Sequence, residues 1–361
     1  MPPHPDAQDN PVRVDLTAVL VAADEGNAFV LTPGNGASLP SGPLEPDHRS
    51  LQAGMRSWVE RQTQHAIGHV EQLYTFGDKD RGERAGDQRS RSAAGHEAAP
   101  GARPSDGDGD GDGPGARAGE AREASGQVRS ISISYLALTR RDPNEGGWRS
   151  WYDFFPWEDR RDEAGRRAGK RVVDDLAAWC DAAAGSARAD RRRRMQAGFG
   201  LGDRWNDELV LQRYELLYEA GLVPEAGTGG TVSAGTASPG ETTSGMGRPM
   251  YRDHRRILAT GIARLRARIR YNPVFFELMP DSFTLLQLQT TVEALAGVAL
   301  HKQNFRRLIE QQALVEETGA SADGGRGRPA KLFRFRREVM QARQMAGSRL
   351  PLARTGRGPV G

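Results

Sequence analysis

The stretch FTLLQLQTTVEALAG (283–297) decides the fold of the C-terminal part of the chain. Thr284 followed three residues later by Gln287 is the pattern of a capping box, in which each side chain bonds a free backbone N–H of the first helical turn. Apolar residues then recur at helical spacing, at Leu285, Leu288, Val292 and Leu295. The segment therefore predicts a capped helix with one buried face, which ends at Gly297.

The residues after this helix predict a second helix and a hairpin. In HKQNFRRLIEQQ (301–312), Phe305, Leu308 and Ile309 face inward, and the outer face is cationic and rich in amides. Two short strands follow in ALVEETG (313–319) and KLFRFR (331–336), separated by the glycine-rich GGRGRPA (324–330). Helix, turn, polar helix and hairpin in this order is the layout of a winged helix-turn-helix, whose second helix enters the major groove of DNA. We assign it residues 272–340, followed by a disordered tail at 341–361.

Basic residues gather where such a domain would meet double-stranded DNA. Between Gly324 and Arg337 there are six basic residues and no acid, and the Arg-Gly-Arg-Pro at 326–329 resembles the core of an AT-hook. A solvated charged surface is the usual explanation for a single cationic helix, but here the fold layout and the charge placement agree. We expect Arg256 to hold phosphates, and we predict DNA contacts for Lys302, Gln303, Asn304, Arg306, Arg307, Arg326, Arg328 and Lys331.

The preceding segment, YRDHRRILATGIARLRARIRY (251–271), predicts the helix that connects this domain to the rest of the chain. One apolar stripe runs along it, and seven arginines are expected around the remaining surface. The range 12–250 before it is assigned to one α+β domain, after a disordered N-terminus at 1–11.

Strands and one helix are predicted at the front of this first domain. VRVDLTAVLVAA (12–23) and AFVLT (28–32) predict two strands joined by a turn, and further strands are expected at 69–76 and 128–138. Ser50 can cap a helix over SLQAGMRSWVERQTQHA (50–66). The prolines and glycines of LPSGPLEPDH (39–48) argue against regular structure there. Residues 77–127 have too few large apolar groups to offset the entropy of ordering, which predicts a disordered insertion.

A helical insertion is expected at 161–222, with helices at 170–183 and 205–221, and a low-complexity linker at 224–247. The aromatic WYDFFPWED (151–159) predicts a loop or strand edge packed on the core. The run DRRRR (190–194) is interpreted as a solvated charge run beside a flexible Ala/Gly stretch. The DGDGDGDG at 106–113 lacks the glutamate that ends a calcium-binding loop, so we expect no metal there.

Composition narrows the class of protein. Cys180 is the single cysteine of 361 residues, which excludes an internal disulfide and a multi-cysteine zinc site and favours a reducing compartment. The start of the sequence lacks a signal peptide, and no run of eighteen apolar residues predicts a membrane span. We therefore expect a cytoplasmic, nucleoid-associated protein without membrane contact. The formal net charge of +3 says little by itself, because basic and acidic residues nearly cancel.

The spacing around the first predicted helix resembles a Nudix box. Gly42 is followed after five residues by His48, and after seven more by RSWVERQT (56–63), in which Arg56, the apolar Trp58 and Glu60 keep the frame. His48, Ser57, Arg61 and Thr63 stand where that box has three glutamates and a glycine. Several carboxylates on one helix face are needed to hold Mg²⁺ against a diphosphate. Glu60 beside Arg61 cannot assemble such a site, so we predict no catalytic residues, no metal and no cofactor.

Together the two ends of the chain resemble the Nudix-related transcriptional regulators of bacteria. The resemblance rests on 251–336 and, more weakly, on 12–76 and 128–160. It implies a Nudix-like α/β/α sandwich followed by a winged helix, a homodimer, and repression of transcription controlled by a nucleotide or sugar metabolite such as ADP-ribose. On this resemblance, Arg56 and Glu60 are the candidate effector-binding residues. The alternative is a Nudix hydrolase of nucleoside diphosphate derivatives that carries a basic tail.

Overall fold

The computed structural model describes residues 12–77, 129–227, 245–322 and 329–336, apart from residues 25, 66, 68, 69, 143, 144, 203, 272 and 273. The predicted disordered ends, most of the insertion at 77–127, the DGDGDGDG run and most of the linker at 224–247 lie outside these ranges. None of the helices in this part of the chain combines the length and apolar character required to cross a membrane.

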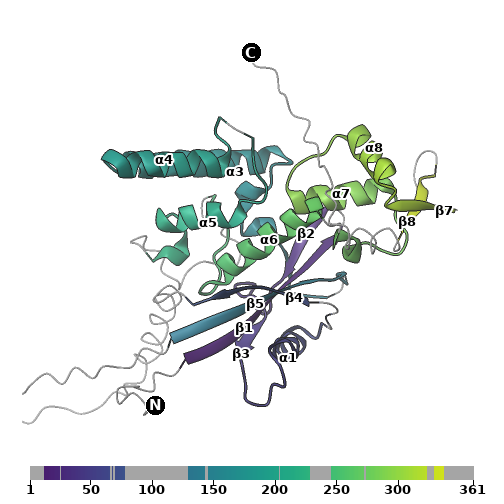
Figure 1. Cartoon of the computed structure of the whole chain (residues 1–361), viewed down its shortest axis with the longest axis horizontal. Coiled ribbons are helices and arrows are strands. Elements are labelled where there is room, and N and C mark those ends of the chain that lie inside the picture. The colour runs from purple at the N-terminus through teal and green to yellow at the C-terminus, as the bar shows by residue number, and fades with distance from the viewer. Residues whose placement is uncertain are drawn as a thin grey trace, which may run out of the picture.

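A mixed sheet organises the first part of the chain (Figure 1). Its strand order is β4-β5-β1-β2-β6, and β3 pairs with β1. Strand β1 runs parallel to β5 and antiparallel to β2 and β3. The strands are β1 (Val12–Asp24), β2 (Asn27–Leu31), β3 (Ser41–Pro43), β4 (Val70–Phe76), β5 (Arg129–Leu138) and β6 (Trp148–Ser150).

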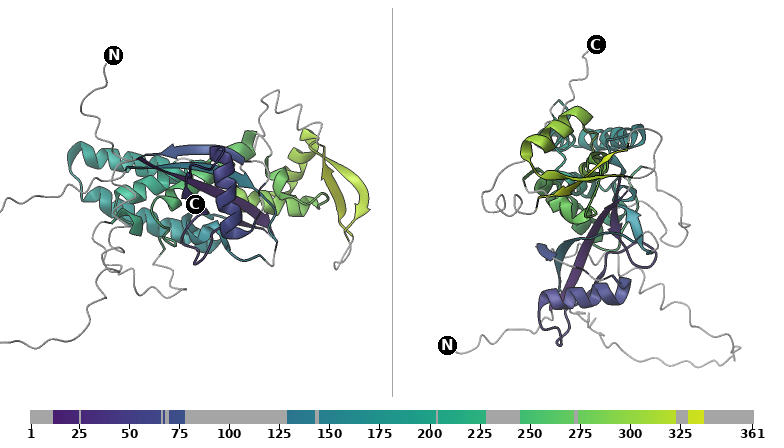
Figure 2. Two further views of the ribbon diagram at one scale, coloured as in Figure 1. Left: turned by 90° about the horizontal axis from the view of Figure 1, so that it is seen from below. Right: turned by 90° about the vertical axis from the view of Figure 1, so that its right-hand side faces the viewer.

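Strand β1 is covered on both faces. Leu16, Ala18 and Leu20 are buried with Met55 and Val59 of α1 (Leu51–Thr63), on one side of the sheet. The alternate residues Val19 and Val21 belong to the cluster that includes the apolar stripe of α6 (His254–Tyr271), on the other side. Figure 2 shows α1 as a separate layer, with the sheet between it and the remaining helices. The predicted α/β/α layering follows from this alternation, because successive side chains of a strand point to opposite faces.

Helix α1 starts where the sequence predicts, since the Ser50 side chain accepts a hydrogen bond from Ala53 N at 3.1 Å. The expectation of no regular structure at 39–48 is wrong. Ser41, Gly42 and Pro43 form β3, with Asp15 opposite Pro43 on β1. Proline and glycine are tolerated here because β3 is very short and pairs with β1 alone.

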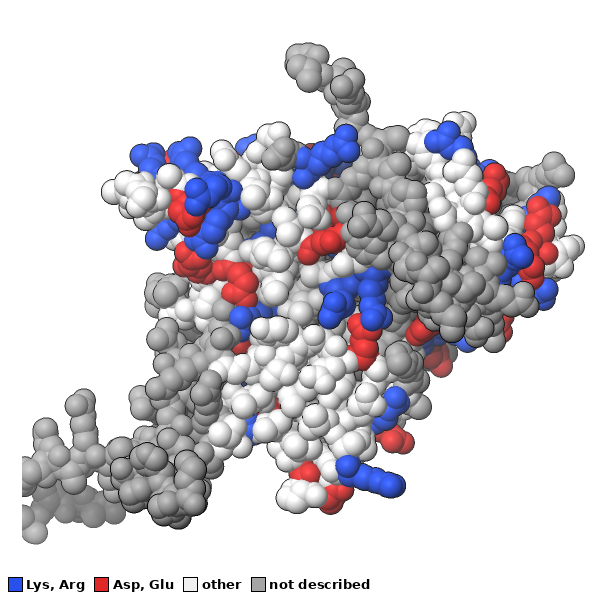
Figure 3. Space-filling view, in the orientation of Figure 1, with Lys and Arg blue, Asp and Glu red and all other residues white. Residues whose placement is uncertain are grey.

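The range 161–222 holds three helices, α3 (Glu163–Asp181), α4 (Gly185–Phe199) and α5 (Val210–Glu219). Helix α4 contradicts the interpretation of 190–194 as a charge run beside a flexible stretch. Met195 and Phe199 are buried, and Arg194 forms two hydrogen bonds of 2.7 Å with Glu219 of α5. The arginines are thus the outer face of a packed helix, and Figure 3 shows them gathered at one end of the molecule.

The aromatic segment 151–159 packs inward as two short turns, η1 (Trp151–Asp153) and η2 (Pro156–Glu158). Trp151, Phe154, Phe155 and Trp157 are completely buried beside α5 and α6. Two turns lie on either side of α6, at η3 (Pro224–Ala226) and η4 (Val274–Leu278).

The seven arginines of the connecting helix do not all lie on its surface. Arg255 and Arg266 are fully buried, and each bonds a carboxylate from a distant segment, Glu225 and Glu158 respectively. Sequence periodicity treats every arginine as solvent-facing, but a guanidinium is buried when carboxylates and carbonyls satisfy its N–H groups.

Candidate nucleic-acid interface

The helix-turn-helix consists of α7 (Leu285–Ala296) and α8 (Lys302–Gln312). The predicted capping box is present, because Gln287 N donates to Thr284 Oγ1 at 3.1 Å and Thr284 N donates to Gln287 Oε1 at 2.7 Å. Gly297 ends α7 in the left-handed conformation, with φ of 71°. Phe305 and Ile309 of α8 are buried against the core, so the opposite side of α8 faces solvent.

The outer face of α8 carries polar groups that have no partner among the residues that the structure describes. Lys302, Gln303, Arg306 and Arg307 are exposed, and Asn304 is partly buried. Within the ranges that the structure describes, none of these five side chains has a hydrogen bond or an ion pair. Such an array of unpaired donors is able to bind phosphate oxygens and the base edges of a duplex.

The hairpin that follows is formed by β7 (Val315–Ser321) and β8 (Lys331–Phe335). It is fixed to the helices by Phe335, whose ring lies 4.4 Å from that of Phe283, and by backbone hydrogen bonds between Phe283 and Phe333. Its predicted tip residues Arg326 and Arg328 lie outside the described residues.

The cations of β8 differ from those of α8, because acids on β7 neutralise them. Lys331 Nζ lies 2.8 Å from Glu317, and Arg334 Nε lies 2.6 Å from Glu316, which Arg336 also approaches at 3.9 Å. No acid lies between 324 and 337 in the sequence, and the partners Glu316 and Glu317 come from the opposite strand, so local composition does not reveal them. Lys331 is therefore exposed but paired, unlike Arg306 and Arg307.

Arg256, expected to hold phosphates, is instead part of the contact between α5 and α6. Its Nε lies 2.6 Å from Glu215, its guanidinium lies over the ring of Phe76, and only 16% of the side chain is exposed. This guanidinium is already paired with a carboxylate, so the structure contradicts the expectation that Arg256 holds phosphates.

The eroded Nudix box has become a packing arrangement. A Cβ on Gly42 would lie 2.1 Å from the ring of Trp58, whose Nε1 donates to Pro43 O at 2.9 Å. Arg61 lies over the same ring at 3.9 Å and pairs with Glu45 at 3.3 Å. The matching positions of the box therefore hold β3 against α1.

The candidate effector residues lie one turn apart on α1. Arg56 is partly buried and donates to Ile67 O, while Glu60 is exposed. Glu45, Asp47 and His48 bring three potential ligand atoms within 4.8 Å, but Nδ1 of His48 already accepts a hydrogen bond from Glu45 N. Glu71 cannot join Glu60, because it pairs with Arg268 of α6 on the opposite side of the sheet.

Comparison with known proteins agrees with the C-terminal assignment. The family described as "NrtR DNA-binding winged helix domain" matches residues 275–335. Residues 275–335 are thus similar to the winged helix of the NrtR family. The expected α+β fold with a C-terminal winged helix-turn-helix is confirmed.

Individual proteins match this chain over a short range or at low identity. The chain is 42% identical over 83 residues to an "ADPR responsive transcriptional repressor NtrR" of Acinetobacter baylyi, an alignment that covers 23% of this chain and spans about a third (33%) of that repressor. Crystallised NrtR of Shewanella oneidensis in complex with a 27mer DNA aligns over 94% of this chain and 98% of its own, with 17% identity and a TM-score of 0.44. A MutT/nudix family protein from Enterococcus faecalis aligns over 93% of this chain and 90% of its own, with 12% identity and a TM-score of 0.45.

Proposed function

We propose that this NrtR-type chain is a transcriptional regulator that binds specific double-stranded DNA through α8 and acts as a repressor. The outer face of α8 carries the proposal, because its cations and amides have no partner within the described ranges, whereas those of β8 do. Arg306 and Arg307 are suited to bidentate contacts with guanine, and Gln303 and Asn304 to contacts with adenine. Lys302 at the start of α8 is suited to a phosphate.

Selection of a random duplex library on the purified chain would test this function. We expect enrichment of one sequence. The logarithm of the affinity for it should fall linearly with the logarithm of the salt concentration, with a slope of about −0.9 per phosphate contact. Failure to enrich any sequence, together with no retention of duplex DNA at low salt, would refute DNA binding.

We infer that the first domain binds an effector of the ADP-ribose class. The repressor from Acinetobacter baylyi is described as responsive to ADPR, and that description motivates the choice of ligand. Arg56 and Glu60 are the proposed contacts on α1. Titration of ADP-ribose in a calorimeter, and into a preformed complex with the selected duplex, tests both binding and its effect on DNA affinity. Arg56→Gln should weaken ADP-ribose binding without changing the affinity of the free chain for DNA.

We also propose that the chain does not hydrolyse nucleoside diphosphate derivatives. His48, Ser57 and Arg61 stand where a Nudix enzyme would present metal-binding carboxylates, and Glu60 is the remaining acid of the box. A homodimer is proposed on the family resemblance, and sedimentation of the free chain tests it.

A further inference from the structure

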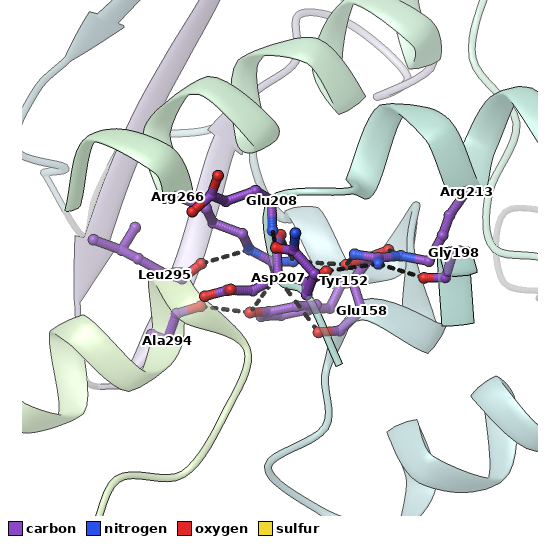
Figure 4. Close-up of polar contacts among 10 residues, drawn as sticks. Tyr152, Glu158, Gly198, Asp207, Glu208, Arg213, Arg266, Ala294 and Leu295 are labelled. Atoms are coloured by element: carbon purple, nitrogen blue, oxygen red, sulfur yellow. Dashed lines mark hydrogen bonds and ion pairs between the residues drawn. The ribbon is translucent and has the colours of Figure 1, made fainter. Parts of the chain in front are cut away.

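The C-terminal end of α7 is capped by side chains that do not belong to the winged helix. The last carbonyls of a helix have no partner inside it, so they need donors from elsewhere. Tyr152 donates its hydroxyl to Ala294 O at 2.5 Å, and Arg266 Nε donates to Leu295 O at 3.0 Å. Both donors are buried, one on η1 and the other on α6. Figure 4 shows them converging on these two carbonyls.

The residue that follows α7 is held by the same segment. Gly297 O accepts a hydrogen bond from Arg160 N at 2.7 Å. A Cβ on Gly297 would lie 2.3 Å from Glu158 O and 3.0 Å from the Tyr152 hydroxyl, so backbone and side chains approach here as closely as glycine permits. The start of the helix-turn-helix turn is therefore fixed to residues 152–160.

The turn between α7 and α8 is in turn held against α7 by side-chain hydrogen bonds. Glu293 Oε1 accepts from Leu300 N at 2.8 Å and from Gln289 Nε2 at 3.0 Å, and Gln289 Nε2 also donates to Leu300 O at 3.1 Å. These bonds close the turn between α7 and α8. A displacement of residues 294–297 must therefore move the start of α8.

Glu158 extends this connection to the three helices α3–α5. Its Oε2 accepts from Arg266 Nη1 at 2.6 Å, and its two oxygens accept from Arg213 of α5, with Nε to Oε1 at 2.5 Å and Nη2 to Oε2 at 2.8 Å. Arg213 in turn donates to Gly198 O of α4 at 2.9 Å. All three side chains are nearly inaccessible to solvent, with exposures of 0% for the arginines and 1% for Glu158.

The charge state of this cluster favours a fixed geometry. Burial alone would raise the pKa of Glu158, but Arg213 and Arg266 outweigh it and hold the pKa below its usual value. Ionised groups with several satisfied donors and acceptors have few alternative arrangements in a dry interior. Any movement of α5 that shifts Arg213 must therefore be accommodated by Glu158 and Arg266.

We propose that the helices α3–α5 form a regulatory arm. A movement of this arm would change the position of the turn before α8 through four positioning residues, Arg213, Glu158, Arg266 and Tyr152. None of the four contacts DNA in this proposal, which rests on DNA binding by α8. A ligand or protein that displaces α5 would change DNA affinity without touching the winged helix.

Two variants and one matched control test the proposal in the full-length chain. Tyr152→Phe removes the hydroxyl that caps Ala294 O and keeps the ring, and Arg213→Met removes the partner of Glu158 on α5. Arg194→Met is the control, because Arg194 lies on α4 and bonds Glu219 at the surface of the same arm. Affinity for the selected duplex is measured below the thermal unfolding transition of each variant, with hydrogen exchange of peptides covering residues 285–312.

We expect Tyr152→Phe to lose about three- to tenfold in DNA affinity, which is the effect of about one lost hydrogen bond. Arg213→Met should lose at least as much, because it removes more than one hydrogen bond. The salt slope should remain that of the unmodified chain, because no phosphate contact is removed. Exchange should increase at residues 294–301, and Arg194→Met should change neither measurement. Wild-type affinity and exchange in folded Tyr152→Phe would overturn the proposal, and would do so even if Arg213→Met failed to fold. Should the unmodified chain bind no DNA, the function proposed for α8 fails, and the exchange data alone decide whether the arm is connected to the turn.

Discussion

Replacing Arg307 by alanine is the sharpest test of how α8 meets DNA. Its guanidinium is exposed and has no hydrogen-bond or ion-pair partner in the part of the chain that the structure describes. The substitution therefore breaks no contact known to support the fold, and a change in affinity reports on the duplex. Surface substitutions of this kind change the free energy of unfolding by about 0.5 kcal/mol or less.

The magnitude depends on which part of the duplex Arg307 reaches. A lost bidentate contact to guanine costs about 1–3 kcal/mol, equivalent to about 5- to 160-fold in affinity, and acts on the selected duplex only. A lost phosphate contact acts on every duplex and lowers the salt slope by about 0.9. With that slope, the loss caused by the substitution should shrink about 3.5-fold between about 50 and 200 mM salt. We expect the first behaviour, because Arg307 projects from α8, the helix proposed to enter the major groove.

Arg334→Ala is the matched control, since Arg334 is equally basic but already bonds Glu316 at 2.6 Å. Fluorescence anisotropy, over that range of salt, measures the affinity of the unmodified chain, Arg307→Ala and Arg334→Ala for the selected duplex and for a scrambled duplex. We expect Arg334→Ala to change affinity by less than about twofold, because a paired surface cation contributes little. A recognition role for α8 is refuted if Arg334→Ala abolishes discrimination between the duplexes and Arg307→Ala leaves it intact.

Three further predictions concern the first domain and the connecting helix α6. Gly42→Ala should lower the free energy of unfolding by about 1–3 kcal/mol in urea titrations, because its Cβ would enter the ring of Trp58; an unchanged midpoint would contradict this packing. Incubation with ADP-ribose and Mg²⁺ should release no AMP, and a metal-dependent release that disappears in Glu60→Gln would favour the hydrolase instead. Burial lowers the pKa of His254 from 6.5 to about 4, so this group stabilises the fold fully above pH 6.5 and loses that contribution as pH falls towards 4. Unfolding measured at pH 7 and 5 should differ by about 2 kcal/mol from this residue, and most of the difference should vanish in His254→Gln.

Elements defined by neighbouring residues could be predicted from the sequence. The capping box of Thr284 and Gln287 and the cap of α1 at Ser50 depend on contacts within a few residues. Each was found because its signal and its structure occupy the same short segment. The outer face of α8 was predictable for the same reason, since helical spacing alone separates Phe305 and Ile309 from Arg306 and Arg307.

Elements that depend on distant partners were missed. The strand β3 exists because β1 offers it a free edge, and its own sequence argues against it. Helix α4 is stabilised because Met195 and Phe199 are buried in the core and its arginines pair with acids on α3 and α5. The aromatic segment before α3 gave no local indication that Glu158 would accept hydrogen bonds from two buried arginines.

The distribution of partners, more than the number of cations, determines which arginines of this chain are available to DNA. Glu158 binds Arg266 across 108 residues of sequence, and Glu316 binds Arg334 across 18, so neither guanidinium is available without breaking an existing bond. Arg306 and Arg307 have no such carboxylate within the described residues. A net charge of +3 therefore coexists with a concentrated cationic face on α8. Because Arg256 and Lys331 already pair with Glu215 and Glu317, the cations of α8 are the ones, among the described residues assigned to DNA, that need break no ion pair to bind a phosphate, and we expect them to contribute to salt-dependent binding.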